Sequence, residues 1–471
     1  MDLHIIITDG RAVSGQVYRQ IREAIIDGRL RPRDALPSTR ELARRLRIAR
    51  NSVLEAYERL RAEGYLESRH GSGTFVRDGV ARRADEAVRP SPLKPRSLWD
   101  SFPDGVDMAA TTAEFDLRPG TPDAASFPYA SWRARVARQF HHHAVGLGAH
   151  IGPAGHHGLR DAIARHIAIS RGVHASPDDV VITNGSQQAI DLIARVLLEP
   201  GDTVAVEDPG YPLPRHALRA NGCRVVGVPV DGEGLMVDAL PSDARLVYVT
   251  PSHQFPLGMA MTTPRRQALL AWAERADATI VEDDYDSEFR YGGRPLPSLQ
   301  GLDESGRVLY VGSLSKVLLP TLRLGFVVVP PALRSALRRA KFAADWHTAV
   351  PLQAAAAEFI DDGLLARHLR RMRRVYAERH DRIMQILERD FAGRLTPLPS
   401  NGGLHLAAWV TDGLNTPDVT IVERAREVGV AVLPLSRYYL DVPPRHGLLI
   451  GYGAVHVSRV DDALRRLSHC L

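Results

Sequence analysis

Lys316 is one of only three lysines in a chain of 471 residues that contains 57 arginines. It closes the segment Gly312-Ser313-Leu314-Ser315-Lys316 and lies seven residues before Arg323. A guanidinium group stays protonated, whereas a lysine amine can lose its proton and attack a carbonyl carbon. Lys316 is therefore a candidate nucleophile that forms a Schiff base with an aldehyde cofactor, and a solvated surface charge is the alternative.

A candidate anion site precedes Lys316 in the chain. Residues 178–183 predict a turn and a buried strand, and the following Asn184-Gly185-Ser186-Gln187-Gln188 predicts a glycine turn that opens a helix. Such a turn directs free backbone N–H groups and the positive end of the helix at an anion. The sequence therefore favours a phosphate at this position.

Carboxylates gather at the end of a later strand. Residues 278–281 are an apolar run that ends in Glu282-Asp283-Asp284-Tyr285-Asp286. In open α/β sheets the carboxyl ends of the strands face the crevice that binds ligands. One of these carboxylates could keep a ring nitrogen protonated, because a carboxylate stabilises an adjacent cation. An acidic turn that only caps the strand is the alternative.

These segments resemble the signatures of fold type I aminotransferases, in the same order and at similar spacing, over residues 115–471. The matching segments are residues 184–188, 207–212, 251–258, 282–289 and 313–316 with 322–325. The resemblance implies pyridoxal 5′-phosphate (PLP) bound to Lys316, with Asp283 on the pyridinium nitrogen, Tyr285 on the ring hydroxyl and Tyr211 stacked on the ring. It also implies that the phosphate is held by Gly185, Ser186, Gln187, Ser313, Ser315 and Arg323. Amides and hydroxyls donate hydrogen bonds, and arginine binds two oxygens at once.

Two positions depart from the aminotransferase pattern. Leu449 aligns with the arginine that usually holds the substrate carboxylate, and Phe255 replaces the asparagine that faces the ring hydroxyl. An α-amino acid then loses one of its two anchors, so ordinary transamination is not expected. The residues that could supply replacement contacts are Arg215, His216, His253 and Arg437.

The first 78 residues predict a separate small domain. Apolar residues at positions 17, 18, 21 and 25 fall at helical spacing, and Ser38 is expected to cap a second helix, with Glu41 completing a capping box. A third helix from Arg50 has an apolar stripe at positions 53, 57 and 60, which leaves Arg50, Asn51 and Ser52 at its start. A helix-turn-helix presents this part of its second helix to base edges in the major groove.

Residues 64–76 predict a two-stranded hairpin with a glycine-rich tip that can approach a phosphate backbone closely. The segment resembles the winged helix-turn-helix of the GntR family, and a small helical protein-interaction domain is the alternative. We call residues 1–78 the reader. The residues expected to contact DNA are Ser38, Thr39, Arg40, Arg50, Asn51, Ser52, His70, Gly71 and Gly73.

Charge and composition separate the reader from the rest of the chain. The first 97 residues carry a formal charge of +7 and the remaining 374 carry −2. A basic excess confined to the first part of the chain is expected if that part binds the phosphates of DNA. Residues 79–110 are rich in proline and arginine and predict a linker. Alternating strand and helix patterns in residues 111–471 predict an α/β domain with a doubly wound parallel sheet, and a small α+β subdomain is expected in about residues 345–471. The clearest strands are residues 203–207, 245–250, 278–281 and 308–311.

The cysteines, the apolar runs and the histidines bear on where the protein is expected in the cell and on whether it binds a metal. Cys223 and Cys470 give no disulfide framework, and no apolar run is long enough to span a bilayer. A bacterial cytoplasmic protein with no membrane association is expected. The histidines at positions 141–143, 156 and 157 lack a zinc-like spacing, so no metal site is expected and surface or interface histidines are the interpretation.

A GntR-like reader joined to an aminotransferase-like domain resembles the MocR family of bacterial transcription regulators over nearly the whole chain. The resemblance implies a head-to-tail homodimer that binds double-stranded operator DNA, and in which PLP, or a small amine bound to it as an aldimine, changes operator binding. A catalytically active aminotransferase with an attached reader is the first alternative. The second alternative is a winged-helix protein whose large domain has become a dimerisation scaffold.

Overall fold

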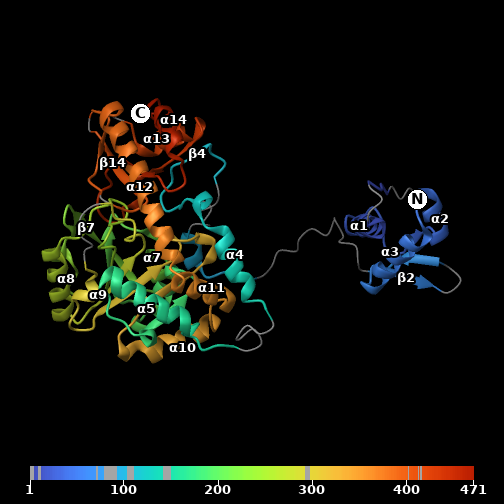
Figure 1. The fold of residues 1–471 in the computed structure, drawn as a ribbon, viewed down its shortest axis with the longest axis horizontal. Helices are drawn as coiled ribbons and strands as arrows, with labels where there is room; N and C mark the ends of the chain where they lie inside the picture. The colour runs from blue at the N-terminus through green and yellow to red at the C-terminus, as the bar shows by residue number, and fades with distance from the viewer. Residues whose placement is uncertain are drawn as a thin grey trace. The chain divides into compact units, whose positions relative to one another are not determined.

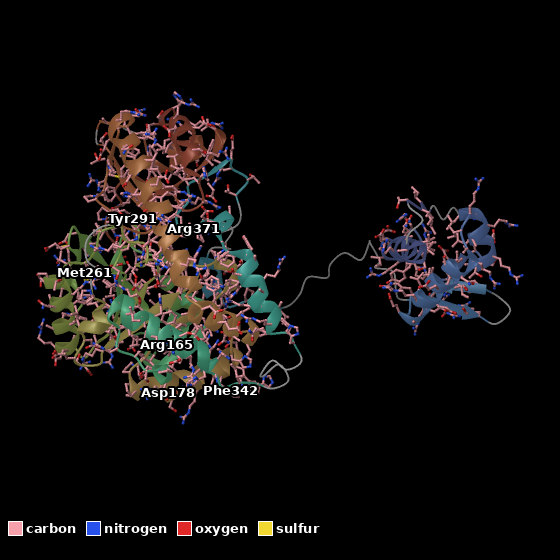
Figure 2. The ribbon with its side chains drawn as sticks, viewed as in Figure 1. Arg165, Asp178, Met261, Tyr291, Phe342 and Arg371 are labelled. Atoms are coloured by element: carbon pink, nitrogen blue, oxygen red, sulfur yellow. The ribbon has the colours of Figure 1, made fainter. Side chains whose placement is uncertain are left out.

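The computed structural model describes residues 5–8, 12–69, 73–78, 93–102, 111–141, 150–291, 297–400, 402–411, 413 and 416–471. It divides into two compact units, residues 1–100 and residues 101–471 (Figure 1). Each unit has hydrophobic clusters of its own, and Figure 2 shows the described side chains on the ribbon. In the described part of the chain, no helix has both the length and the hydrophobicity needed to cross a bilayer.

The smaller unit is the expected winged helix-turn-helix. Its helices are α1 (Val13–Ile26), α2 (Thr39–Leu46) and α3 (Arg50–Ala62), and its strands are β1 (Ala35–Leu36), β2 (Leu66–Arg69) and β3 (Gly73–Val76), in the order β1-β3-β2. Val17, Ile21, Val53 and Leu60 are fully buried in one core, as their spacing predicts. Ser38 Oγ accepts from Glu41 N, but Glu41 Oε1 accepts from Arg45, so only one half of the predicted capping box forms.

The larger unit is built on an eight-stranded sheet. Its order is β5-β12-β11-β10-β9-β6-β7-β8, with bounds β5 Val180–Thr183, β6 Thr203–Asp208, β7 Arg224–Asp231, β8 Gly234–Leu235, β9 Ala244–Val249, β10 Thr279–Asp284, β11 Val308–Ser313 and β12 Gly325–Val328. Along β5, Val181 and Ile182 belong to two different hydrophobic clusters. Because successive strand residues point to opposite faces, both faces of the sheet are covered, as in a doubly wound fold.

The prediction of a parallel sheet is wrong at two strands, because the edge strand β8 pairs antiparallel with β7 and the interior strand β12 is antiparallel as well. β12 pairs antiparallel with β11 and with β5. Gly325 at its start lies beside Gly185, where an added Cβ would be 2.7 Å from the Gly185 backbone. The antiparallel direction therefore brings the residues that precede β12 to the edge where the parallel strands end.

Helices flank the large sheet and connect it to a small one (Figure 1). They are α4 Tyr129–Arg138, α5 His157–Arg171, α6 Ser186–Leu197, α7 Pro212–Ala220, α8 Thr263–Arg275, α9 Leu299–Leu302, α10 Arg334–Asp345, α11 Val350–Asp361 and the long α12 Leu364–Asp390. The small sheet has the order β13-β14-β17-β16, with bounds β13 Leu395–Pro397, β14 His405–Val410, β16 Leu433–Pro434 and β17 Gly447–Gly451. With α13 Asp418–Glu427 and α14 Val460–Ser468 it makes an α+β subdomain.

The small subdomain also takes in an early segment of the chain. β4 (Phe115–Asp116) pairs parallel with β15 (Val430–Ala431), so residues far apart in sequence share one short ladder. Within the predicted linker, Ser97–Ser101 forms a 3-10 helix, which the proline-rich composition did not indicate. Cys223 and Cys470 are both free and buried.

Candidate functional site

One edge of the large sheet collects the residues that sequence patterns singled out. β5, β10 and β11 end there at Thr183, Asp284 and Ser313, with parallel pairing of β10 to β11. Arg323 precedes the antiparallel β12, so it reaches the same edge from the opposite chain direction. Lys316 follows β11 by three residues. The carboxyl ends of the strands and one strand start therefore share a single site, in agreement with the ligand-binding rule for open α/β sheets.

Lys316 is held in place by a backbone carbonyl. Its Nζ donates to Gly120 O at 2.6 Å, and an added Cβ on Gly120 would lie 2.6 Å from Nζ. Burial lowers the pKa of Lys316, whereas the Asp286 and Asp283 carboxylates oppose that change. A lower pKa increases the fraction of unprotonated amine, which is the form that attacks a carbonyl carbon.

Asp283 has one carboxylate oxygen available. Tyr248 donates to Oδ2 at 2.6 Å, and the buried Oδ1 has no hydrogen-bond partner among the described residues. Burial raises the pKa of Asp283 to about 7, and the neighbouring Asp284 adds to this effect. A buried acceptor without a partner is costly, so Oδ1 is suited to receive an N–H donor such as a protonated ring nitrogen.

A candidate phosphate site lies at the start of α6. Gly185 is the N-cap with φ 78°, and no side chain caps the helix, so the first-turn N–H groups point outward. Arg323 Nη2 donates to Asn184 O at 2.7 Å, and an added Cβ on Gly185 would lie 2.9 Å from Nη2. A positive helix end beside a guanidinium group fits a phosphate dianion.

The other predicted phosphate ligands differ in the hydrogen-bonding groups that are available to an anion. Ser313 and Ser315 are buried, and Ser313 Oγ accepts from Ser315 N at 3.1 Å. The side chain of Gln187 donates to Leu213 O at 3.0 Å. The Gln187 backbone amide, on the first turn of α6, is therefore the part of that residue suited to the anion.

Phe255 is the centre of an aromatic cluster. Its ring centroid lies 5.2 Å from those of Tyr211, His405 and Tyr438 and 6.2 Å from that of Tyr285. The Tyr285 hydroxyl donates to His253 O at 2.9 Å. The same oxygen lies 3.0 Å from His253 Nδ1. A hydroxyl oxygen also accepts hydrogen bonds, so the contact with the cofactor's ring hydroxyl that the resemblance implies stays a prediction.

Leu449 lies in an apolar environment, as its residue type predicts. It is 0% exposed and packs in a cluster with Leu257, Ala407, Leu435 and Tyr438. The structure therefore offers an apolar wall at the position that holds the substrate carboxylate in aminotransferases.

Arg215, one of the four candidate replacement contacts, is engaged by backbone carbonyls. Arg215 Nη2 donates to the carbonyl oxygens of Glu207, Gly210 and Tyr438, and burial lowers its pKa. The His216 ring lies 5.3 Å from the Phe102 ring. Arg215 therefore joins the two subdomains through backbone contacts.

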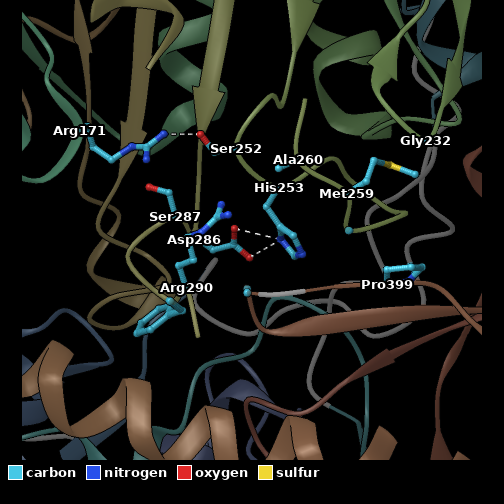
Figure 3. Close-up of a pocket in the computed structure, with 14 residues that line it drawn as sticks. Arg171, Gly232, Ser252, His253, Met259, Ala260, Asp286, Ser287, Arg290 and Pro399 are labelled. Atoms are coloured by element: carbon cyan, nitrogen blue, oxygen red, sulfur yellow. Dashed lines mark hydrogen bonds and ion pairs between the residues drawn. The ribbon is translucent and has the colours of Figure 1, made fainter. Parts of the chain in front are cut away.

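His253 is bound to a carboxylate that sequence reasoning did not connect with it. Its Nδ1 lies 3.0 Å from Asp286 Oδ2, and both side chains are buried. Together with His405 they form a group whose ligand-type atoms lie within 4.8 Å of one another. The pair lines a cavity of about 260 Å³ whose walls also include Arg171, Ser252, Met259 and Arg290 (Figure 3). Of the histidines first considered for metal binding, His142 and His143 lie outside the described residues, and His156 caps α5.

The reader presents its predicted DNA contacts on its surface. Arg40, Arg50 and Asn51 are exposed at the starts of α2 and α3, and Ser52 is half-buried. Ser38 and Gly73 are also exposed, Thr39 is half-buried, and Arg50 Nε donates to Thr39 Oγ1 at 3.4 Å. His70 and Gly71 lie outside the described residues.

The buried carboxyls predict how stability depends on pH in the absence of cofactor. Burial raises the pKa of Asp283 and of Glu207 to about 7. Between about pH 4 and pH 7 the folded state keeps protons that the unfolded chain has lost, so stability falls as pH rises, by at most ~1.4 kcal/mol per pH unit for each group. His368, whose pKa burial lowers to about 4, contributes in the opposite direction over the same range. We therefore expect the melting temperature of the cofactor-free Asp283→Asn protein to rise relative to that of the wild-type protein as pH increases from about 4 to about 7, and identical pH profiles would contradict the prediction.

Comparison with known proteins agrees with both units. The family model for aminotransferase class I and II matches residues 120–467, and the model for bacterial regulatory proteins of the gntR family matches residues 13–76. Among solved structures, kynurenine aminotransferase from Pyrococcus horikoshii is 29% identical with a TM-score of 0.71, covering 80% of this chain and 95% of that one. Fold and site together define a winged helix-turn-helix regulator joined to an aminotransferase-like domain.

Relatives that share both units identify the family. The chain is 39% identical to a probable rhizopine catabolism regulatory protein, MocR, of Rhizobium meliloti, covering 96% of this chain and 92% of that protein. It is 32% identical to the pyridoxine biosynthesis transcriptional regulator PdxR of Corynebacterium glutamicum, covering 96% and 94%. The chain belongs to the MocR family of helix-turn-helix transcription regulators.

Proposed function

We propose that this protein is a PLP-dependent transcription regulator that binds operator DNA through the reader and senses PLP, or a small amine, at Lys316. The proposal is supported by one observation above all. The Lys316 amine, the unpaired Asp283 Oδ1 and the Arg323 guanidinium share one sheet edge, in a chain that also carries the reader.

When bound, PLP supplies an aldehyde that forms an imine with an amine. Lys316 provides that amine, and its lowered pKa keeps part of it unprotonated. Asp283 Oδ1 would accept the ring N–H, and the start of α6 with Arg323 would hold the phosphate. Tyr211, next to Phe255, would pack on the ring.

The output of this site is proposed to be a change in DNA affinity. A head-to-tail homodimer would place two readers on paired half-sites, as helix-turn-helix dimers do. A ligand changes operator affinity only by the difference in its affinity for two arrangements of that dimer, typically by ~1–3 kcal/mol. The apolar wall at Leu449 supports sensing over turnover, because an amino acid substrate lacks its carboxylate partner there.

The test is a DNA-binding titration of the full chain on the region upstream of its own and neighbouring genes. It is done without cofactor, with PLP, and with PLP plus an amine panel. We expect at least one condition to change affinity by roughly fivefold or more. Equal affinity in every condition would exclude the sensing role.

A working aminotransferase is the second candidate, because Lys316, Asp283 and Arg323 form a complete cofactor set. Steady-state assays against amino acid and keto acid pairs distinguish the two functions. Turnover of about 10 per second, an ordinary enzyme rate, would favour the enzyme.

A further inference from the structure

His405 presents a buried nitrogen that nothing in the described structure satisfies. The residue begins β14 and is 1% exposed. Its ring forms a hydrogen bond with the Pro256 backbone, while Nε2 has no partner. Burial lowers the pKa of His405 well below its ordinary value, and the charges of His253 and Lys316 act in the same direction. The ring is therefore neutral, and Nε2 is a lone-pair acceptor.

Strand geometry places His405 on the same face of the small sheet as Leu449, with Gly451 as its direct cross-strand partner. Ala407 on β14 is the direct partner of Leu449 on β17. Residues i and i+2 of a strand point to the same face, so His405 shares the face of Ala407 and Leu449. The His405 ring also lies 5.2 Å from the Phe255 ring, which contacts Tyr211. The acceptor thus borders both the apolar wall and the aromatic cluster.

The side chains next to His405, His253 and Asp286, are held in place by their contact with each other. The Asp286 carboxylate binds His253 Nδ1, and the two rings of His253 and His405 lie 4.8 Å apart. An added Cβ on Gly403 would lie 2.1 Å from His253 Cε1, so the His253 ring is closely packed. A divalent cation would need several lone pairs directed at one point. Here Asp286 is already engaged by His253, and one unpaired nitrogen suits one hydrogen-bond donor.

We propose that His405, supported by the His253–Asp286 pair, forms the subsite that receives a hydrogen-bond donor of the amine effector. The effector is then an amine that carries a second donor group, a hydroxyl or an ammonium, in place of a carboxylate. The proposal rests on the proposed sensing function. A carboxylate at His405 Nε2 would meet an acceptor nitrogen, with the Asp286 carboxylate and the Leu449 side chain nearby, and none of these three groups donates to it. Arg171 and Arg290 line the cavity of Figure 3, whose lining does not include His405.

The test uses four amines with the same three-carbon chain and different ends: propanolamine, diaminopropane, propylamine and β-alanine. Binding to the PLP-loaded full chain is measured by calorimetry and by the shift of its visible absorption band. We expect propanolamine or diaminopropane to bind roughly tenfold more tightly than propylamine, the gain from pairing a buried acceptor, and β-alanine to bind weakest.

Substitutions test whether the preference for donor-bearing amines comes from His405. His405→Phe should reduce the advantage of the donor-bearing amines over propylamine to about twofold or less. His405→Gln, which keeps an acceptor oxygen near the Nε2 position, should retain it. His380→Phe is the matched control, because His380 is 9% exposed and its Nε2 also lacks a partner.

The outcomes separate this inference from the function on which it rests. If PLP never gives a visible band, the sensing function fails. If the band forms but β-alanine binds most tightly, or His405→Phe leaves the preference unchanged, the subsite is wrong and the sensing function stands. A stoichiometric divalent metal that survives dialysis and is lost in His405→Phe would also overturn the subsite, because the trio would then be a metal centre.

Discussion

Replacing Lys316 with alanine is expected to abolish the absorption band near ~420 nm that a PLP imine gives. The band requires an amine within reach of the cofactor aldehyde, and Lys316 Nζ lies at the sheet edge that also holds Asp283 and Arg323. The cofactor should then dissociate on dialysis, and the response of operator binding to PLP should be lost with it. Absorbance spectra before and after dialysis measure the first effect, and the DNA titration measures the second.

The small number of lysines provides the controls. Lys94 is exposed, and Lys341 Nζ is buried in hydrogen bonds to Gln188 and Asp345. Lys94→Ala and Lys341→Arg should therefore keep the band. A band that persists in Lys316→Ala and disappears in either control would assign the attachment to another lysine and remove the basis for the proposed function.

Local patterns predicted the parts of the site that are built from one segment each. A strand, a glycine and a helix start placed Ser186 at an uncapped helix end, and an apolar run ending in acids placed Asp283 at a strand end. Parallel strands end at the same edge, so these segments and Lys316 meet wherever such a sheet forms. The fold class followed from the same alternation of strands and helices.

Features that form only where two distant segments of the chain meet could not be predicted from the sequence pattern. β12 is a short apolar run like its neighbours, and only its pairing shows that it is antiparallel. His253, Asp286 and His405 come from the ends of three strands in two sheets, and no spacing in the sequence connects them. Conversely, adjacency in the sequence, as in His141-His142-His143, does not by itself predict that side chains converge on one point, because adjacent residues of a helix or a strand point in different directions.

Tyr285 shows a further limit of assigning a residue's role from the matching position of a family motif. The motif predicts its residue type, but its hydrogen bond to His253 O depends on the backbone path of residues 251–256. The His253 carbonyl accepts from the Tyr285 hydroxyl, and the His253 ring contacts both that hydroxyl and Asp286. A substitution at His253 is therefore expected to disturb the predicted site residue Tyr285 and its neighbour Asp286 together, and it is a poor single-residue test of either.

Replacing Arg50 with alanine is expected to weaken specific operator binding by about 1–3 kcal/mol, the loss of one base-reading side chain. Arg50 begins α3, is exposed, and donates one long hydrogen bond of 3.4 Å to Thr39 Oγ1. Its removal should leave the reader folded, which a thermal melt checks. Fluorescence anisotropy on the operator and on a scrambled duplex measures specific and non-specific binding side by side.

Arg61 on the same helix provides the comparison that decides the orientation of α3. It is also exposed, but it lies at the opposite end of α3 and its Nη1 donates to Ser68 Oγ at 3.0 Å. If the start of α3 enters the major groove, Arg50→Ala lowers the ratio of operator to scrambled affinity, whereas Arg61→Ala lowers both affinities equally or neither. A contribution from phosphate contact alone would appear as an equal loss on the two duplexes and a smaller salt dependence. Unchanged operator affinity in Arg50→Ala would place a different face of the reader on the DNA.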